Sequence, residues 1–239
     1  MAFVQTIKKF LTVQAAKAGS RWLLRALQHI LFPTFCTACK DLLFERKALC
    51  CECAREIKPV VSTKLIVTQK YAVEVHAVGL YDGPLRQLIL AKSYSDRTAC
   101  YYMAQLMYEH LIEEKGLPFD YIIFIPLHWT RYAKRGYNQS QEIARYISRW
   151  SKVPIANIVS RTKRTPFQVM FDKAGRQSNV KDAFSLRITK DQFKDFTHKR
   201  FLLIDDVMTT GATLQAVARE LLVLKPLAIK ACVLARTSG

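Results

Sequence analysis

The sequence predicts an α/β fold in which a parallel β-sheet is flanked by helices and is preceded by a small four-cysteine module. Apolar runs within 120–126 and 201–204 have the length and composition of strands buried on both faces of a parallel sheet. Each run is followed by a helical pattern, at 138–150 and at 212–224, and such alternation indicates a parallel sheet. Two C-x-x-C pairs near the N-terminus mark the separate module.

The length of the chain limits how many domains it can form, and its net charge indicates what kind of partner it binds. The 239 residues, half of them hydrophobic, suffice for one α/β domain with a small appendage. We expect a basic N-terminal region at 1–31, the cysteine module at 32–60 and the main domain at 70–239, with a linker at 57–70. The 37 Lys and Arg exceed the 19 Asp and Glu by 18, which favours an anionic partner. No apolar run approaches the length of a membrane span, so we expect a cytoplasmic protein.

The first 31 residues are basic and contain no acidic side chain. Apolar residues such as Trp22, Leu23 and Leu27 recur there at helical spacing, which predicts a basic amphipathic helix at about 20–31. Packing against the following module is the commoner role of such a helix. A membrane surface and nucleic acid are the alternative partners.

The cysteine pattern indicates a metal site. Cys36 and Cys39 form one C-x-x-C pair, and Cys50 and Cys53 form the second. Each pair places two sulfur atoms on one side of a tight turn, so that together they can complete a tetrahedral zinc site. A redox site would need only one such pair, which leaves a buried or redox-active thiol pair as the alternative. We interpret Cys51 as a bystander between two ligands.

The segments between these landmarks carry weaker signals. Residues 71–81 alternate as a strand, on which we interpret His76 as a surface or strand-edge residue without a catalytic role. A helix is expected at 97–115, with its apolar stripe in the core. Further strands are expected near 155–160 and at 228–235.

Residues 201–213, FLLIDDVMTTGAT, are the most informative stretch. Asp205 and Asp206 cap the apolar strand, and a Thr- and Gly-rich turn then enters a helix. Backbone N–H groups and threonine hydroxyls at such a turn can hold a phosphate, and Gly211 permits close approach of the backbone. Carboxylates beside a phosphate cradle suit a ligand with a phosphate and neighbouring hydroxyls, such as a ribose 5-phosphate. The plainer alternative is an ordinary strand, turn and helix with a solvated acidic pair.

This string closely resembles the phosphoribosyl pyrophosphate (PRPP) motif of type I phosphoribosyltransferases. It lacks the lysine of a GxxxxGK[ST] nucleotide-binding loop, which argues against an ATPase of that type.

Basic residues concentrate in 131–176, where eleven Lys and Arg face two acidic residues. Arg131, Lys134 and Arg135 follow a predicted strand end, so we expect them at the same sheet edge as the turn after 204. His128 is a candidate metal ligand or base, or an imidazole that packs in the loop. The segment 161–184 is polar, basic and aperiodic, and loops of this length commonly serve as lids or are disordered.

Six further basic residues of this region are candidate contacts to single-stranded DNA, with three aromatic residues available for stacking. The basic candidates are Arg145, Arg149, Lys152, Lys163, Arg164 and Lys173, and the aromatic ones are Tyr137, Trp150 and Phe167. A solvated basic face without a partner is the alternative.

Taken in order, the motifs resemble the ComF family of competence-associated proteins. The paired C-x-x-C knuckles are followed by YDGPLRQLILAKSYSDR, PLHWTRYAKRGYNQ and LLIDDVMTTGATL, and the resemblance covers about residues 30–236. It implies a zinc-finger-like N-terminal module, a type I phosphoribosyltransferase fold and a role with incoming single-stranded DNA in natural transformation or DNA utilisation. Proteins of the competence machinery are then possible partners.

The resemblance also implies roles for individual residues. Asp205 and Asp206 match the ribose-binding acids, and with Arg131 they are the candidate catalytic residues. The 5-phosphate loop matches Thr209, Thr210, Gly211, Ala212 and Thr213, and the pyrophosphate loop falls at Leu127 and His128, with Arg131 and Arg135 beyond. Mg²⁺ would accompany PRPP, and zinc would be structural.

Two functions are consistent with this resemblance. In the first, the chain binds PRPP as a ligand that sets the state of a protein whose task is to hold DNA or a partner. In the second, the chain is an active phosphoribosyltransferase of nucleotide metabolism whose acceptor the sequence does not reveal. The chain as given ends soon after the last predicted strand, without a segment that would form a nucleobase pocket.

Overall fold

The structure is a computed structural model. It describes residues 34–43, 47–91, 97–113, 118–127, 132–133, 136–161 and 183–238. The basic helix expected at 20–31 lies outside these residues. In the described part of the chain, no helix is long and apolar enough to cross a membrane.

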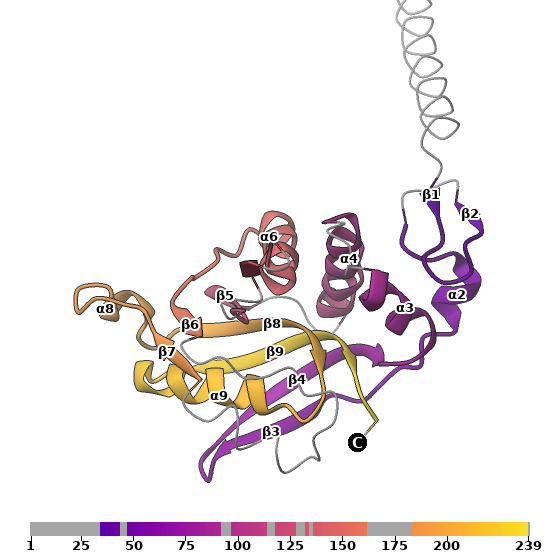
Figure 1. Ribbon diagram of the computed structural model, residues 1–239. Helices are drawn as coiled ribbons and strands as arrows, with labels where there is room; N and C mark the ends of the chain where they lie inside the picture. The colour runs from indigo at the N-terminus through magenta and orange to yellow at the C-terminus, as the bar shows by residue number, and fades with distance from the viewer. Residues whose placement is uncertain are drawn as a thin grey trace, which may run out of the picture.

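A five-stranded sheet forms the centre of the molecule (Figure 1). Its order is β3 (Thr63–Thr68), β4 (Tyr71–Leu80), β9 (Ala228–Arg236), β8 (Arg200–Met208) and β5 (Tyr121–Phe124). The last four strands run parallel, as predicted. The β8 strand continues through the acidic pair to Met208, four residues beyond the apolar run that predicted it.

The interpretation of 57–70 as a linker is wrong, because β3 lies within it and pairs antiparallel with β4. The sheet is therefore mixed, with an antiparallel edge strand. Gln69 and Lys70 alone join the two strands, and neither residue is typical of a tight hairpin turn.

Helices cover both faces of the sheet (Figure 1). One face packs against α3 (Gly83–Ala91), α4 (Arg97–Glu113) and α6 (Gln139–Ser151), and the other against α9 (Ala212–Leu221), which continues as the 3₁₀ turn η1 (Leu222–Leu224). Residues of β8 enter both cores in alternation, with Leu202 and Ile204 on the α6 side and Phe201 and Leu203 on the α9 side. This double burial explains the continuous apolar run of β8.

A second, two-stranded antiparallel sheet pairs β6 (Val159–Arg161) with β7 (Phe184–Leu186). The strand expected near 155–160 is therefore only partly present, because β6 begins at Val159 and Ile155 forms only an isolated bridge to Ile122. The short helix α8 (Phe193–Phe196) follows and precedes the amino end of β8.

The cysteine module consists of β1 (Thr34–Phe35), β2 (Leu42–Leu43) and α2 (Cys51–Arg55). Buried Cys36 and Cys53 belong to the same hydrophobic core as α3 and α4, so the module packs on the main domain. Gly79 of β4 lies at this junction, where an added Cβ would come within 2.9 Å of the Lys58 carbonyl oxygen and 2.7 Å of the Ile57 side chain.

The interpretation of His76 as a surface or strand-edge residue is also wrong. Its side chain is buried on β4, which lies between β3 and β9. The imidazole Nδ1 lies 3.0 Å from the Ser62 hydroxyl, and Nε2 lies 3.6 Å from a carboxylate oxygen of Glu74. Both faces of β4 are covered, so the polar residue in its alternating pattern did not mark an open face.

Candidate functional site

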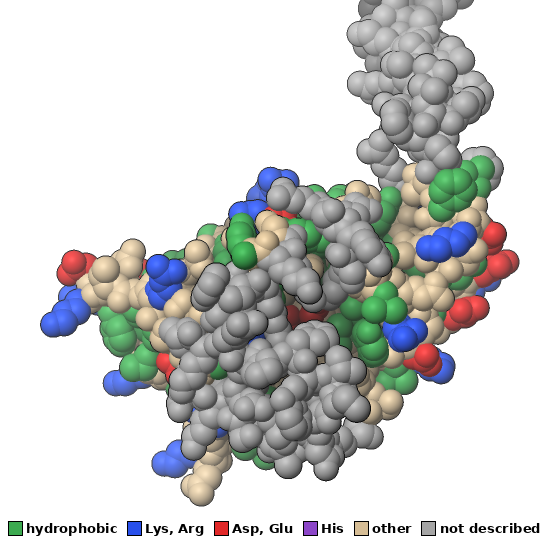
Figure 2. All heavy atoms as spheres, in the orientation of Figure 1, with side chains coloured by type: hydrophobic (Ala, Val, Ile, Leu, Met, Phe, Trp, Pro, Cys, Tyr) green, Lys and Arg blue, Asp and Glu red, His purple; other side chains and the backbone are tan. Residues whose placement is uncertain are grey.

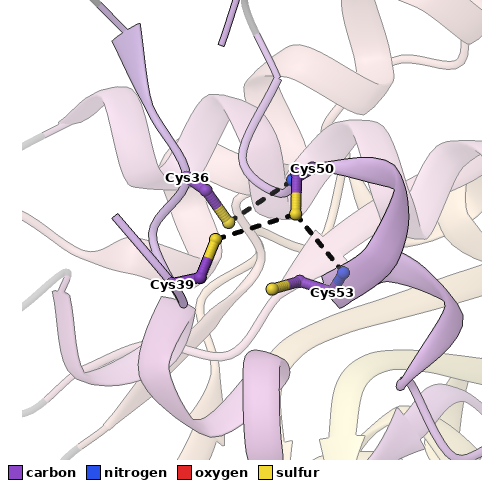
Figure 3. Close-up of side chains that lie close together, drawn as sticks. All are labelled: Cys36, Cys39, Cys50 and Cys53. Atoms are coloured by element: carbon purple, nitrogen blue, oxygen red, sulfur yellow. Dashed lines mark hydrogen bonds between the residues drawn. The ribbon is translucent and has the colours of Figure 1, made fainter. Parts of the chain in front are cut away.

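The four predicted cysteine ligands converge on one point (Figure 3). Their sulfur atoms all lie within 4.8 Å of one another, and the Sγ atoms of Cys39 and Cys50 are 3.7 Å apart. The turn after β1 supplies Cys36 and Cys39. The N-cap of α2 supplies Cys50, and its first turn supplies Cys53.

The thiols of Cys36, Cys39 and Cys53 differ in pKa, because their burial and their hydrogen bonds differ. Burial raises the pKa of the Cys36 thiol, but backbone N–H groups of Cys50, Cys39 and Ala38 outweigh burial and lower that pKa to about 6. The backbone N–H of Asp41 lowers the pKa of Cys39, but the Asp41 carboxylate, which accepts from Cys39 Sγ at 3.1 Å, helps to raise it to about 11. Burial, followed by hydrogen bonds with the neighbouring thiols, raises the pKa of Cys53.

This arrangement fits a tetrahedral metal ion. Sulfur ligands at ~2.3 Å from a tetrahedral ion lie about 3.8 Å from one another, close to the 3.7 Å between Cys39 and Cys50. Binding such an ion requires all four thiols to lose their protons. The convergence of two pairs also favours a metal site over the single redox pair that was the alternative.

The acidic pair lies at the carboxyl end of β8, as predicted, although within the strand. Both side chains are half-buried. Asp205 Oδ1 accepts a hydrogen bond from Ser140 Oγ at 2.9 Å and one from the Asp206 backbone N–H at 2.9 Å. Asp206 Oδ1 accepts one from the Val207 backbone N–H at 2.7 Å.

The turn after β8 brings the predicted phosphate-loop residues to the N-terminus of α9. Gly211 is the N-cap, in the left-handed region at φ 78°, and Ala212 begins the helix. Thr210 Oγ1 accepts from the Ala212 N–H at 3.4 Å, Thr209 is exposed, and Thr213 is half-buried in the first turn. Backbone N–H groups at such a helix start favour an anion.

The carboxyl end of β5 lies beside that of β8, as the parallel pairing requires. The Ile125 N–H donates to the Ile204 carbonyl at 3.0 Å, and half-buried Leu127 follows two residues later. The predicted pyrophosphate-loop residues His128, Arg131 and Arg135 lie outside the described residues.

Of the candidate DNA contacts, Arg145 and Arg149 are exposed on α6, whereas Lys163, Arg164, Lys173 and Phe167 lie outside the described residues. Arg145 pairs with Glu142, and the Arg149 guanidinium lies 5.8 Å from the Tyr146 ring centroid. The prediction that Tyr137 is available for stacking is wrong, because its side chain is buried.

Half-buried Trp150 is part of an aromatic cluster between α4 and α6, with ring centroids 5.6 Å from Tyr101 and 5.4 Å from Tyr108. Tyr101, which belongs to the apolar helical stripe expected in the core, is 36% exposed. On the face shown in Figure 2, Lys and Arg side chains of the described residues lie at separate places.

Comparison with known proteins supports the predicted phosphoribosyltransferase domain and the predicted resemblance to the ComF family. Residues 134–238 match the phosphoribosyl transferase domain. The chain is 36% identical over 155 residues to competence protein F of Haemophilus influenzae, a match that covers 60% of this chain and 64% of that protein. This chain is a homologue of competence protein F with a phosphoribosyltransferase domain.

This chain also matches DNA utilization protein YhgH of Escherichia coli K12, with 27% identity over 237 residues, and the match covers 92% of this chain and 97% of that protein. Among solved structures, the purine phosphoribosyltransferase from Pyrococcus horikoshii Ot3 matches with a TM-score of 0.34 and 22% identity, covering 57% of this chain and 74% of that chain. The two relatives and the domain match confirm the predicted resemblance to the ComF family, and the domain match together with the observed sheet confirms the predicted fold class.

Two contacts at the site were not predicted. Ser140 was not singled out, although it stands two residues after the helix-capping residue Asn138 in GYNQSQ. Leu65, from the supposed linker, packs where a Cβ on Gly211 would come within 2.7 Å of it. A hydroxyl in the first turn of the helix after 137 was the available signal for Ser140. No local signal marked Leu65.

Proposed function

We propose that this homologue binds PRPP, or a related ribose phosphate, at the carboxyl ends of β8 and β5. One observation carries the proposal: an acidic pair on β8 is followed within a few residues by a glycine-centred turn at the N-terminus of α9. The two halves of this site suit the two halves of the ligand, ribose hydroxyls for the carboxylates and a phosphate for the helix start.

The residues divide the ligand as follows. Asp205 and Asp206 accept from the ribose 2- and 3-hydroxyls, and the turn Thr209–Thr213 holds the 5-phosphate. Leu127, His128, Arg131 and Arg135 are the proposed contacts to the pyrophosphate, whose negative charge positive side chains and backbone N–H groups would offset. Carboxylate and phosphate oxygens are ligands that suit Mg²⁺, which would neutralise charge on the pyrophosphate.

The test is calorimetric titration of the protein with PRPP in Mg²⁺. Changing Asp205→Asn and Asp206→Asn together keeps size and removes both charges, so the affinity should fall tenfold or more, about 1.4 kcal/mol per decade. Asp195→Asn on α8, at the amino end of β8, is the matched control and should leave the affinity unchanged. Unchanged binding in the double variant would contradict the assignment of these acids.

We propose that the biological role is in competence or DNA utilisation, with single-stranded DNA as partner. The names of the two relatives, competence protein F and DNA utilization protein, support this role. Arg145 and Arg149 are exposed on α6, and the Arg149 guanidinium lies 5.8 Å from the Tyr146 ring, which belongs to the aromatic cluster of Tyr101, Tyr108, Tyr146 and Trp150. Positive charge beside aromatic rings is the usual composition of a surface that binds single strands.

Filter retention at several salt concentrations tests the DNA proposal. The slope of log affinity against log salt is about −0.7 per neutralised phosphate, so Arg145→Ala with Arg149→Ala should make it shallower by about 1.4. Lys190→Ala with Lys194→Ala removes the same charge from exposed positions near α8 and should not change the slope. Affinity no tighter than about 10⁻⁴ M near physiological salt would rule out DNA binding, because that is the weak end of non-specific binding.

We propose zinc as the metal of the four-cysteine cluster, with a structural role. Four thiolates leave no ligand position open for chemistry, which is typical of structural zinc. The four ligands come from the turn between β1 and β2 and from the start of α2, so a bound ion would join these two segments at one point.

Active phosphoribosyl transfer is the second candidate function, because the proposed site contains the parts that the reaction needs. Transfer through an oxocarbenium-like transition state requires positioning and charge stabilisation and no protein nucleophile. Steady pyrophosphate release from PRPP in the presence of a metabolite pool, with a ribosylated product detected by mass, would favour the transferase. Binding without turnover would favour the ligand-sensing function.

A further inference from the structure

The Asp205 carboxylate is held by an element other than its own strand. Ser140 Oγ, in the first turn of α6, donates to Asp205 Oδ1 at 2.9 Å across 65 residues of sequence. The same oxygen accepts from the Asp206 backbone N–H at 2.9 Å. Two donors from different directions therefore fix the plane of this carboxylate.

The position of Ser140 is itself fixed. Asn138 caps α6 by accepting from the Gln141 N–H, and its Nδ2 donates to the Ile125 carbonyl at 3.0 Å, just beyond β5. Both Asn138 and Ser140 are buried, at 4% exposure. The first turn of α6 thus fastens the end of β5 through Asn138 and the end of β8 through Ser140.

The Ser140 hydroxyl is not needed as a helix cap, because the Asn138 side chain already fills that role. A donor at the positive end of a helix instead stabilises a negative charge on its acceptor. The contact therefore acts on the orientation and charge of Asp205.

We propose that Ser140 is a positioning residue that sets the Asp205 carboxylate for the ribose hydroxyls of the ligand. This inference rests on the proposed PRPP site. It predicts that loss of the hydroxyl weakens recognition of the ribose and leaves recognition of the pyrophosphate intact.

The experiment compares Ser140→Ala with Ser148→Ala in calorimetric titrations with Mg²⁺. Ser148 is the matched control, because it is a hydroxyl at the far end of the same helix that donates to the Val153 carbonyl at 2.6 Å. The two probes are ribose 5-phosphate, which has the hydroxyls, and inorganic pyrophosphate, which lacks them. Ser140→Ala should lose about five- to tenfold in affinity for ribose 5-phosphate and none for pyrophosphate, and Ser148→Ala should match the wild type for both.

A double-mutant cycle then identifies the acceptor. In a protein that already carries Asp205→Asn, adding Ser140→Ala should change ribose 5-phosphate affinity by less than twofold, because the charged partner is gone. Full additivity of the two changes would overturn the proposal.

The remaining outcomes separate the two proposals. Equal losses for ribose 5-phosphate and pyrophosphate in Ser140→Ala would show a general loosening of the site and would overturn the positioning role while keeping the PRPP site. Failure of the wild type to bind PRPP, ribose 5-phosphate and pyrophosphate would remove the PRPP proposal and this one together.

Discussion

Replacement of Gly211 by alanine should destabilise the protein through two separable effects. Gly211 is buried at φ 78°, and a residue with a Cβ in the left-handed region costs about 1–2 kcal/mol. The added Cβ would also come within 2.7 Å of the Leu65 Cδ1 and Cδ2 atoms on β3. Overpacking of this kind typically costs about 1–3 kcal/mol, so Gly211→Ala should lower the free energy of unfolding by about 2–5 kcal/mol.

Two further variants separate the effects in urea unfolding. Gly83→Ala is the control for the backbone cost, because Gly83 has φ 43° and a Cβ there meets no atom of the described residues within 4 Å. Leu65→Ala removes the obstructing side chain, so the double variant Gly211→Ala with Leu65→Ala should be less destabilised than the sum of the single changes, by about 1–3 kcal/mol. Additivity within about 0.5 kcal/mol would refute the steric part of the argument. A Gly211→Ala variant as stable as the wild type would refute both parts.

Two further predictions concern the metal and an ion pair. Elemental analysis of protein kept reduced throughout purification should find one zinc per chain. The double variant Cys36→Ser with Cys50→Ser should bind no zinc, whereas Cys51→Ser, which changes an exposed cysteine outside the cluster, should retain one zinc. A zinc content near zero in the wild type would contradict the site. Hydrogen bonds from the Arg200 side chain, then from its backbone N–H, hold the pKa of Asp120 below its usual value. The stabilisation from this pair should therefore be present above about pH 4 and should decline as pH falls through the lowered pKa, so the difference in urea midpoint between wild type and Asp120→Asn should shrink in acid; a difference that grows in acid would refute this assignment.

The sequence correctly predicted β8 and the cysteine cluster, because each is encoded by a short stretch of neighbouring residues. The apolar run before Asp205 requires burial on both faces, and the structure confirms it. The C-x-x-C spacing placed four sulfur atoms correctly because each pair is closed by a single turn, and only the meeting of the two turns depends on the fold.

The errors arise where a residue's environment is set by a distant segment. The alternation around His76 suggests a strand with one open face, yet α4 and the segment before β3 cover that face, and Ser62 meets the imidazole. The edge strand β3 was missed because its turn to β4 has no Gly or Asn, so its pairing depends on the packing of the whole sheet.

The proposed ribose phosphate site is supported from both layers of the fold, and the two supports should fail differently. Ser140 reaches Asp205 from α6 on one side of the sheet, and Leu65 meets Gly211 at the start of α9 on the other. Loss of the Ser140 hydroxyl leaves the helix cap at Asn138 intact, so it should reduce ribose 5-phosphate affinity with little change in stability. A Cβ at Gly211 instead requires the Leu65 side chain on β3 to shift, so it should reduce stability and phosphate affinity together. If Ser140→Ala instead lowered stability and phosphate affinity together, and Gly211→Ala lowered only ribose 5-phosphate affinity, the orientation of Asp205 would depend on the α9 layer and not on α6.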